Sequence, residues 1–596
     1  MKSNNIFISS ILSLSILISS CGDMEYNEAT INDEQWVLEN AGQLSGLIGQ
    51  IYASVTHDMG DAPGMYGAML SSACDESELS LSISQIHRYY NGSWSVVNAF
   101  PETWTNSYQA IYAANDFLEK LGIIFSVLED YKYNQDYLIL RRRFELFPFQ
   151  ARFLRAYFHF ELAKTYGDVP LMTKTLTPQE ASLMERTNVQ EVFRYIVKEC
   201  DEINDRLPIS YAKENDPTAQ IGRINRPTVL ALKARTLLYA ASPLHTKGLT
   251  DTEIKELWHQ AALASKELID AASGWGITLS EQYQALWGPN NHYQVPEIIW
   301  FRTAWTSSNQ FAKYNYPAGY ENAMGGNCPT QNLVDAYEFN SSAPPQIAGK
   351  TWQEAEEHNA LPDDPYQNLD PRFALTIARN GETWPTTIPY SDTPLETFDG
   401  GRNGAPTINA SRTGYYLKKY VNGNNRIIPN EANSSYTWII YRLGEFYLNY
   451  AEAMFNYSNR DATATGEGIL NMSANEAINI LRGRAGINMP LFTETGDAWE
   501  ERYIRERMVE LAFEGHRFWD VRRWKNNELA QSFMNIKTIR VNRTAVPGQE
   551  SEYTYSYSRG QTIVRGQWDD KYYLYPIPFG EIQKVPGLTQ NPGWFQ

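Results

Sequence analysis

Cysteine and excess positive charge are both scarce in this chain of 596 residues. Its four cysteines are too few and too scattered for a disulfide framework or a cysteine-rich metal site: Cys21, Cys74, Cys200 and Cys328. Because 51 lysines and arginines face 69 acidic residues, the net charge is −18, which argues against nucleic acid as a partner. Charged residues make up 20% and hydrophobic residues 43%, which excludes a disordered or fibrous chain.

Long hydrophobic runs are also absent, except at the N-terminus. Residues 6–18 form an apolar stretch, interrupted by serine, that leads into Ser19-Ser20-Cys21-Gly22. This stretch is shorter than the about 20 apolar residues that span a bilayer and is typical of a secretory signal peptide. It resembles a bacterial lipobox, which implies that residues 1–20 are removed and that Cys21 carries the lipid. An ordinary signal peptide with an incidental cysteine is the alternative. Residues 21–40, rich in acidic side chains, are expected to form a solvated tether.

Helical periodicity dominates most of the remaining chain. Phe149, Phe153, Ala156 and Phe160 recur at spacings of four, three and four, which places them on one face of a helix that starts at Pro148. Further helices are predicted near residues 227–241, 443–454, 473–486 and 497–515, the last two opened by the capping boxes Ser473 to Glu476 and Asp497 to Glu500. Alternating helices with short polar joints predict a mostly α fold of stacked helix pairs with little β structure.

The pattern changes between about residues 274 and 435. Helical stripes fade there, Gly, Pro, Asn and aromatic residues accumulate, and residues 296–301 read as a short strand. A loop-rich stretch of this length inside a compact domain is usually functional. We therefore expect a helical scaffold that supports a large, loop-rich ligand-binding face.

Three sequence motifs resemble the SusD/RagB family of nutrient-binding lipoproteins. They are residues 151–158 with Tyr166-Gly167-Asp168-Val169-Pro170, residues 505–520 with Arg523-Trp524, and residues 573–578 with Gln590 to Trp594. The resemblance implies one domain over residues 41–596, with tetratricopeptide-like helix pairs. It also implies a lipoprotein on the cell surface, anchored in the outer membrane, that captures a nutrient and caps a SusC-like TonB-dependent transporter.

The ligand of this family is usually a glycan, and proteins hold sugars with aromatic platforms and planar polar side chains. Trp94 lies in a loop where glycan-binding members carry a platform aromatic, so we expect it to face solvent and contact ligand. The second candidate stretch, residues 305–327, presents aromatic residues without helical spacing. The predicted ligand-binding residues are Trp94, Trp305, Tyr314, Tyr316, Tyr320, Arg88, Asn91, Asn309 and Lys313.

Other functions remain open at this stage. The cargo could be a peptide, as in RagB-type members, or the helix pairs could be a scaffold for other proteins. A glycosidase would need two carboxyl groups about 5–10 Å apart across a cleft, and Asp75-Glu76 or Asp363-Asp364 could supply them. We expect no catalytic residues and no cofactor. No cluster of His and Cys suits zinc, so no metal site is predicted, and calcium binding stays open.

The motif of residues 505–520 carries many charges, and its spacing permits a ladder of ion pairs along one helix. Neighbouring arginines lower the pKa values of these carboxyl groups, whereas a general acid needs a raised pKa. The ladder is therefore predicted to be structural. Its members are Arg505, Glu506, Arg507, Glu510, Glu514, Arg517 and Asp520.

Overall fold

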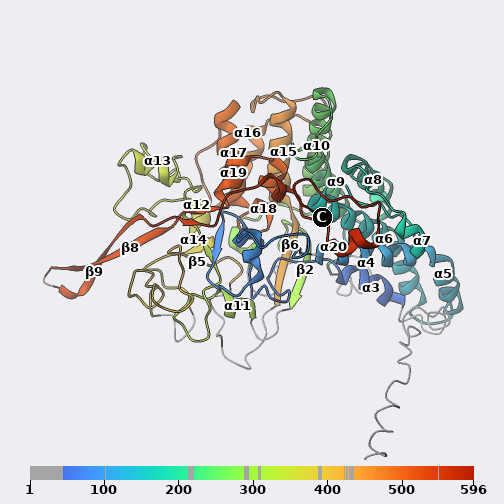
Figure 1. The fold of residues 1–596 in the computed structure, drawn as a ribbon. Coiled ribbons are helices and arrows are strands. Elements are labelled where there is room, and N and C mark those ends of the chain that lie inside the picture. The colour runs from blue at the N-terminus through green and yellow to red at the C-terminus, as the bar shows by residue number, and fades with distance from the viewer. Residues whose placement is uncertain are drawn as a thin grey trace, which may run out of the picture.

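The computed structural model describes residues 44–100, 102–212, 221–287, 294–305, 310–386, 392–421, 423, 427, 435–547 and 549–595. Within this part of the chain, one half of the molecule is helical and the other half is made of loops and short strands (Figure 1). The structure confirms the prediction of a mostly α fold with little β structure.

The helical half is a succession of neighbouring helices (Figure 1). Helix α4 packs against α6, α6 against α8, α8 against α9, α9 against α10, α10 against α15, and α15 against α16. This order of contacts is that of tetratricopeptide-like stacked helix pairs. The helices of this half are α3 (Leu44–Ala53), α4 (Glu102–Glu119), α5 (Leu121–Asp130), α6 (Tyr137–Tyr166), α7 (Pro178–Ser182), α8 (Val189–Ile203), α9 (Arg226–Ala241), α10 (Asp251–Ala272), α15 (Leu443–Tyr457), α16 (Ala474–Arg482), α17 (Gly496–Glu510) and α18 (His516–Trp524).

Helix α6 is the central element of this scaffold and is longer than its sequence predicts. Pro148 lies inside it rather than at its start. A proline within a helix lacks one backbone donor, but burial of Phe144 and Phe147 before it stabilises the additional turns. His159 is structural, as its Nδ1 donates to the carbonyl of Arg155 and its Nε2 accepts from the Met172 amide. Burial lowers the pKa of His159 to about 4, so it stays neutral.

One predicted helix start is wrong. The capping box at Ser473 opens α16 as expected, but α17 begins after Thr495, and Asp497 lies in its first turn. Thr495 does not cap the helix, because its hydroxyl oxygen accepts from the Ala462 amide instead and its proton is donated to the carbonyl of Arg460. Asp497 instead pairs with the side chain of Arg460.

The other half consists of loops, short helices and antiparallel strand pairs. Among the described residues the strands pair as β1–β3, β2–β6, β4–β5, β7–β10 and β8–β9. The strands are β1 (Ser77–Leu79), β2 (Ile298–Trp305), β3 (Asn327–Pro329), β4 (Ile377–Ala378), β5 (Tyr416–Leu417), β6 (Ser435–Arg442), β7 (Asn535–Ile536), β8 (Ile539–Val546), β9 (Gln549–Arg559) and β10 (Ile563–Val564). The short helices are α11 (Gln310–Asn315), α12 (Gln331–Val334), α13 (Trp352–Glu357), α14 (Pro371–Thr376), α19 (Asn527–Ser532) and α20 (Phe579–Lys584).

A buried ion-pair network joins the two halves at α17. Except for Arg505, which has no ion pair among the described residues, the charged side chains of the predicted ladder do pair, but mostly with residues of other elements rather than along the helix. Glu510 accepts from Arg372, Arg442 and Arg484 at 2.6–2.9 Å. Glu506 pairs with Arg372 and Arg482, and Arg517 pairs with Asp75. The network therefore links residues that are far apart in the sequence.

Acid is expected to remove part of this stabilisation. Burial alone would raise the pKa of Glu506, but the guanidinium groups of Arg372 and Arg482 lower it from 4.5 to about 2. A carboxyl group with a depressed folded-state pKa stabilises fully above its unfolded pKa and loses this effect as the pH falls through the folded pKa. The free energy of unfolding, measured with denaturant between about pH 5 and pH 3, should therefore decrease as the pH falls. The decrease should be less steep in Glu506→Gln, and the two slopes should differ by up to about 1.4 kcal/mol per pH unit. Equal slopes would contradict this account of the network.

Candidate functional site

Three of the predicted ligand-binding aromatic residues lie in the core. Trp94 is 3% exposed, Tyr316 is 0% exposed and Tyr320 is 7% exposed. The Trp94 ring stacks on Tyr572 at 5.5 Å between centroids and meets Tyr89 and Tyr575 edge-on. Trp94 therefore does not face solvent as the sequence predicts, because the C-terminal segment covers its loop.

The other predicted residues are more accessible or lie outside the described side chains. Tyr314, Lys313 and Arg88 are half-buried, and Asn91 is exposed. Asn91 Oδ1 accepts from the Ser93 amide and hydroxyl, so it shapes its own turn. Trp305 ends strand β2, but its side chain, like the whole of Asn309, is outside the described part of the structure.

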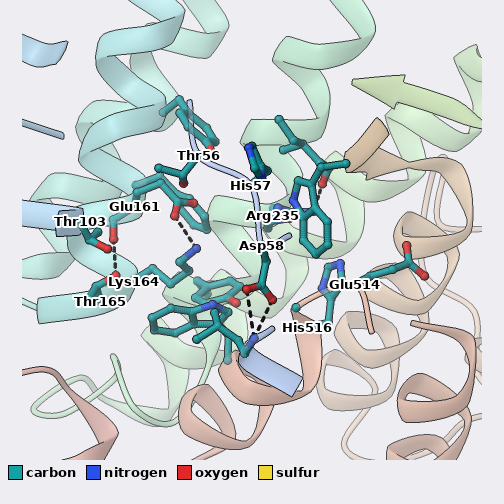
Figure 2. A pocket seen from close by; sticks show the side chains of 18 of the residues that line it. Thr56, His57, Asp58, Thr103, Glu161, Lys164, Thr165, Arg235, Glu514 and His516 are labelled. Atoms are coloured by element: carbon teal, nitrogen blue, oxygen red, sulfur yellow. Dashed lines mark hydrogen bonds and ion pairs between the residues drawn. The ribbon is translucent and has the colours of Figure 1, made fainter. Parts of the chain in front are cut away.

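A polar cavity of about 210 Å³ lies between the two halves of the molecule (Figure 2). Helix α6 contributes Glu161, Lys164 and Thr165, and strand β6 contributes residues 438–440. Residues 56–58 and the start of α18 close the other sides. Gly515, with a φ of 77°, allows the turn that brings His516 into this wall.

Burial shifts the pKa values of two titratable groups of the cavity toward their uncharged forms. Withdrawal from water raises the pKa of Asp58 to about 8, although its carboxylate accepts from the Leu70 amide at 2.9 and 3.0 Å. Burial and nearby arginines hold the pKa of His516 well below its usual value. Both groups can therefore exchange hydrogen bonds with hydroxyl groups without a full charge.

The remaining charges of the cavity are already paired. Glu161 and Lys164 form an ion pair at 2.6 Å (Figure 2). Arg235 donates to Glu445 at 2.7 Å and lies 4.2 Å from the centroid of the Tyr441 ring. The cavity therefore offers many hydrogen-bonding groups with little unbalanced charge.

Aromatic rings form much of its wall. They belong to Tyr89, Tyr157, Phe160, Tyr239, Trp438, Trp519 and Tyr575. The Tyr89 and Tyr575 hydroxyls are hydrogen-bonded at 2.6 Å, and both rings touch Trp94. Trp94 therefore packs behind Tyr89 and Tyr575, which line the cavity, and does not line the cavity itself.

A loop connects this cavity to Tyr314, which lies in the predicted ligand-binding stretch of residues 305–327. The Gly67 amide donates to the Gly60 carbonyl at 2.8 Å, which closes the loop beside Asp58. Beyond this closure, Tyr66 lies 6.0 Å from Tyr314 between ring centroids and is partly exposed. We call these two residues the Tyr66–Tyr314 pair.

Most cavity residues could not be identified from sequence patterns. Glu514 and His516 lie within a motif that is typical of the fold, and its charge pattern predicts a structural role. Thr56, His57 and Asp58 lie in a loop that carries no pattern. Their common site exists only because distant segments pack together.

Three of the four carboxyl groups considered for catalysis are buried or held in an ion pair. Asp75 and Glu76 are both buried, and Asp75 is held by Arg517 at 2.8 Å. Asp364 is paired with Arg379 at 2.9 Å. Among the described residues, no three His, Cys, Asp or Glu side chains are placed to hold a metal ion, and Cys74, Cys200 and Cys328 are buried free thiols.

Comparison with known proteins identifies the family. Residues 296–594 match the SusD family, and residues 34–238 match a family described as starch-binding, associating with the outer membrane. The chain belongs to the SusD family. SusD-like protein P2 of Formosa agariphila is 22% identical over 525 residues, which are 86% of this chain and 89% of that protein.

Solved structures share the SusD fold with this chain. A SusD-like protein of Bacteroides fragilis has a TM-score of 0.70 at 22% identity, and covers 95% of this chain and 99% of its own. A structure described as a laminarin binding SusD-like protein has a TM-score of 0.60 at 19% identity, over 93% of this chain and 99% of its own. Surface glycan-binding protein A of Bacteroides uniformis has a TM-score of 0.59 at 18% identity, over 92% and 99%.

Proposed function

We propose that this SusD-family chain is a cell-surface lipoprotein that binds a glycan without cleaving it and delivers it to a SusC-like TonB-dependent transporter. The observation that carries the proposal is the cavity, which combines aromatic walls with hydrogen-bonding groups of little net charge. Sugars present both apolar C–H faces and hydroxyl edges, so this combination suits them. The names of the laminarin-binding and glycan-binding structures support the same ligand class.

The cavity and the Tyr66–Tyr314 pair are proposed to hold one part of the glycan. The pair offers aromatic rings, and Asp58, His516 and Lys164 offer polar groups that line the cavity. Trp305, Asn309, Lys313, Arg88 and Asn91 stay candidates for further contacts. Trp94, Tyr316 and Tyr320 are proposed to support the site from the core instead.

An array that carries oligosaccharides beside peptides tests the ligand class. We expect the purified mature chain to bind one family of related glycans in a saturable way. Saturable binding to peptides with no response to any glycan would replace this proposal with RagB-type peptide uptake. Binding to neither class, together with capture of other proteins, would favour a scaffold.

The membrane attachment is proposed to depend on Cys21. In the described part of the chain, no helix is long and apolar enough to cross a bilayer. The family description that includes outer-membrane association supports a surface location, which acyl chains on Cys21 would provide through residues 21–40. Residues 41–596 would then form the single folded domain.

Cys21→Ala is expected to release the protein from membranes, because two or more acyl chains supply nearly all of the anchoring apolar area. The measurement is the distribution of protein between washed membranes and supernatant in cells that lack the transporter. Cys200→Ala is a suitable control, since its thiol is buried in the helical half. Retention of Cys21→Ala in the membrane fraction would contradict the lipid anchor.

A further inference from the structure

The β8–β9 hairpin extends away from the body of the protein (Figure 1). Its strand β9 carries a row of tyrosines. Tyr553, Tyr555 and Tyr557 alternate along β9, so they share one face of the hairpin at intervals of about 7 Å. Tyr553 is 42% exposed and Tyr555 is 36% exposed. Core packing does not explain exposed aromatic residues on a projecting hairpin, and such residues mark interaction sites.

An arginine continues this row. Arg543 lies opposite Tyr555 on β8, and its guanidinium carbon is 4.4 Å from the ring centroids of both Phe398 and Tyr553. Among the described residues, the side-chain contacts of Arg543 are with these two rings, so its donors remain available. A planar donor group between ring faces is suited to hydroxyl or carboxylate groups of a ligand.

A cavity of about 570 Å³ lies at the foot of the row. Tyr555 and Tyr557 line one side, and Asp363, Asp364 and the turn from Arg379 to Glu382 line the other. Arg379 is held by Asp364 at 2.9 Å and lies 4.6 Å over the ring of Tyr366. Tyr366 in turn meets Tyr557 edge-on at 5.1 Å. The polar groups of the cavity are therefore fixed by aromatic contacts rather than free on the surface.

One buried donor in the cavity wall lacks a partner. Asn380 is 2% exposed, and its Oδ1 accepts from the Thr397 amide at 3.0 Å. Its Nδ2 lies near the Tyr557 hydroxyl but makes no hydrogen bond of normal geometry within the described residues. Buried amide nitrogens are nearly always satisfied, so a ligand hydroxyl or a bridging water is expected there.

We propose that the tyrosine row, Arg543 and this cavity form a second carbohydrate-binding site, which holds an extended oligosaccharide chain; this inference rests on the proposed glycan-binding function. Concave shape, ring faces at regular intervals and fixed planar polar groups suit a sugar chain. Of the carboxylates, Asp364 is paired with Arg379 and Glu382 with Lys418, so the site is not a cluster of free negative charge. The site is built from different segments than the cavity beside α6.

Two sites on one chain predict a measurable stoichiometry and avidity. A hexasaccharide of the glycan selected on the array should bind with a stoichiometry of two, and the polysaccharide should bind more tightly than the hexasaccharide, because one chain can engage both sites. Tyr555→Ala should reduce the stoichiometry to one and weaken polysaccharide binding about 10-fold or more. Arg543→Gln, which removes charge but little volume, should weaken it in the same direction.

Ser556→Ala is the matched control, because Ser556 is exposed on the same strand and points to the opposite face. Ser556→Ala should leave the stoichiometry and the affinity for the polysaccharide unchanged. Thermal melting should show that all three variants are folded. A stoichiometry of one in the wild type, with Tyr555→Ala binding normally, overturns the second site but leaves the proposed function intact. Loss of co-purification with the transporter in Tyr555→Ala, with unchanged glycan binding, overturns it in favour of a protein contact. Failure of the wild type to bind any glycan on the array rejects the proposed function itself.

Discussion

Glu510→Gln is expected to destabilise the protein by about 3–5 kcal/mol, since breaking a buried ion pair from one side leaves uncompensated charge. The Glu510 carboxylate is completely buried and accepts from three arginines, Arg372, Arg442 and Arg484. A glutamine has nearly the same shape but no charge, and its amide nitrogen would face a guanidinium group. The measurement is chemical unfolding followed by circular dichroism.

Glu500→Gln provides the comparison on the same helix. Glu500 pairs with Arg460 at 2.9 Å, but both side chains are largely exposed. Exposed pairs of this kind contribute about 0–1 kcal/mol. If the two variants lost similar stability, the buried network would not have the role that its burial and its three arginine partners indicate.

Trp94→Ala is expected to destabilise the fold by about 3–5 kcal/mol, the range for loss of a buried tryptophan. The ring lies among Tyr89, Tyr572, Tyr575 and Trp594, so its removal leaves a cavity within an aromatic cluster. Sequence alone predicts the reverse, a folded variant that no longer binds ligand. The structure leads us to expect early melting, with weaker glycan binding only as a consequence of shifts in Tyr89 and Tyr575.

Val97→Ala controls for the loop itself, because Val97 follows Trp94 closely and is 76% exposed. It should melt like the wild type. Thermal melting and a calorimetric titration on the same samples separate the two roles of Trp94. A Trp94→Ala protein that melts normally and fails to bind glycan would restore the tryptophan as a ligand platform.

The helical scaffold could be predicted because its signals are local. The apolar spacing before Tyr166 and the cap at Ser473 each act within a few turns, and the structure contains both helices. The predicted helix starts are wrong where tertiary contacts override local preference. Pro148 lies inside α6 because its neighbours are buried, and Thr495 bonds to Arg460 rather than capping α17.

The candidate site could be predicted only in part, for the same reason. The sequence around a loop aromatic residue does not show whether the ring faces solvent or packs on another segment. Trp94 is buried by residues near the C-terminus, such as Tyr572 and Trp594. The cavity draws its walls from α6, β6, α18 and a loop near the N-terminus, and no local pattern connects them. The partners of Glu510 are equally distant, since Arg372 lies far before it in the sequence.

This chain is proposed to capture a glycan and to leave it intact. A calorimetric titration of the mature chain with the glycan selected on the array tests both points, when the recovered glycan is afterwards sized by chromatography. We expect saturable binding and an unchanged chain-length distribution after prolonged incubation. Absence of saturable binding, or shortened chains in proportion to the amount of protein, would contradict this proposal.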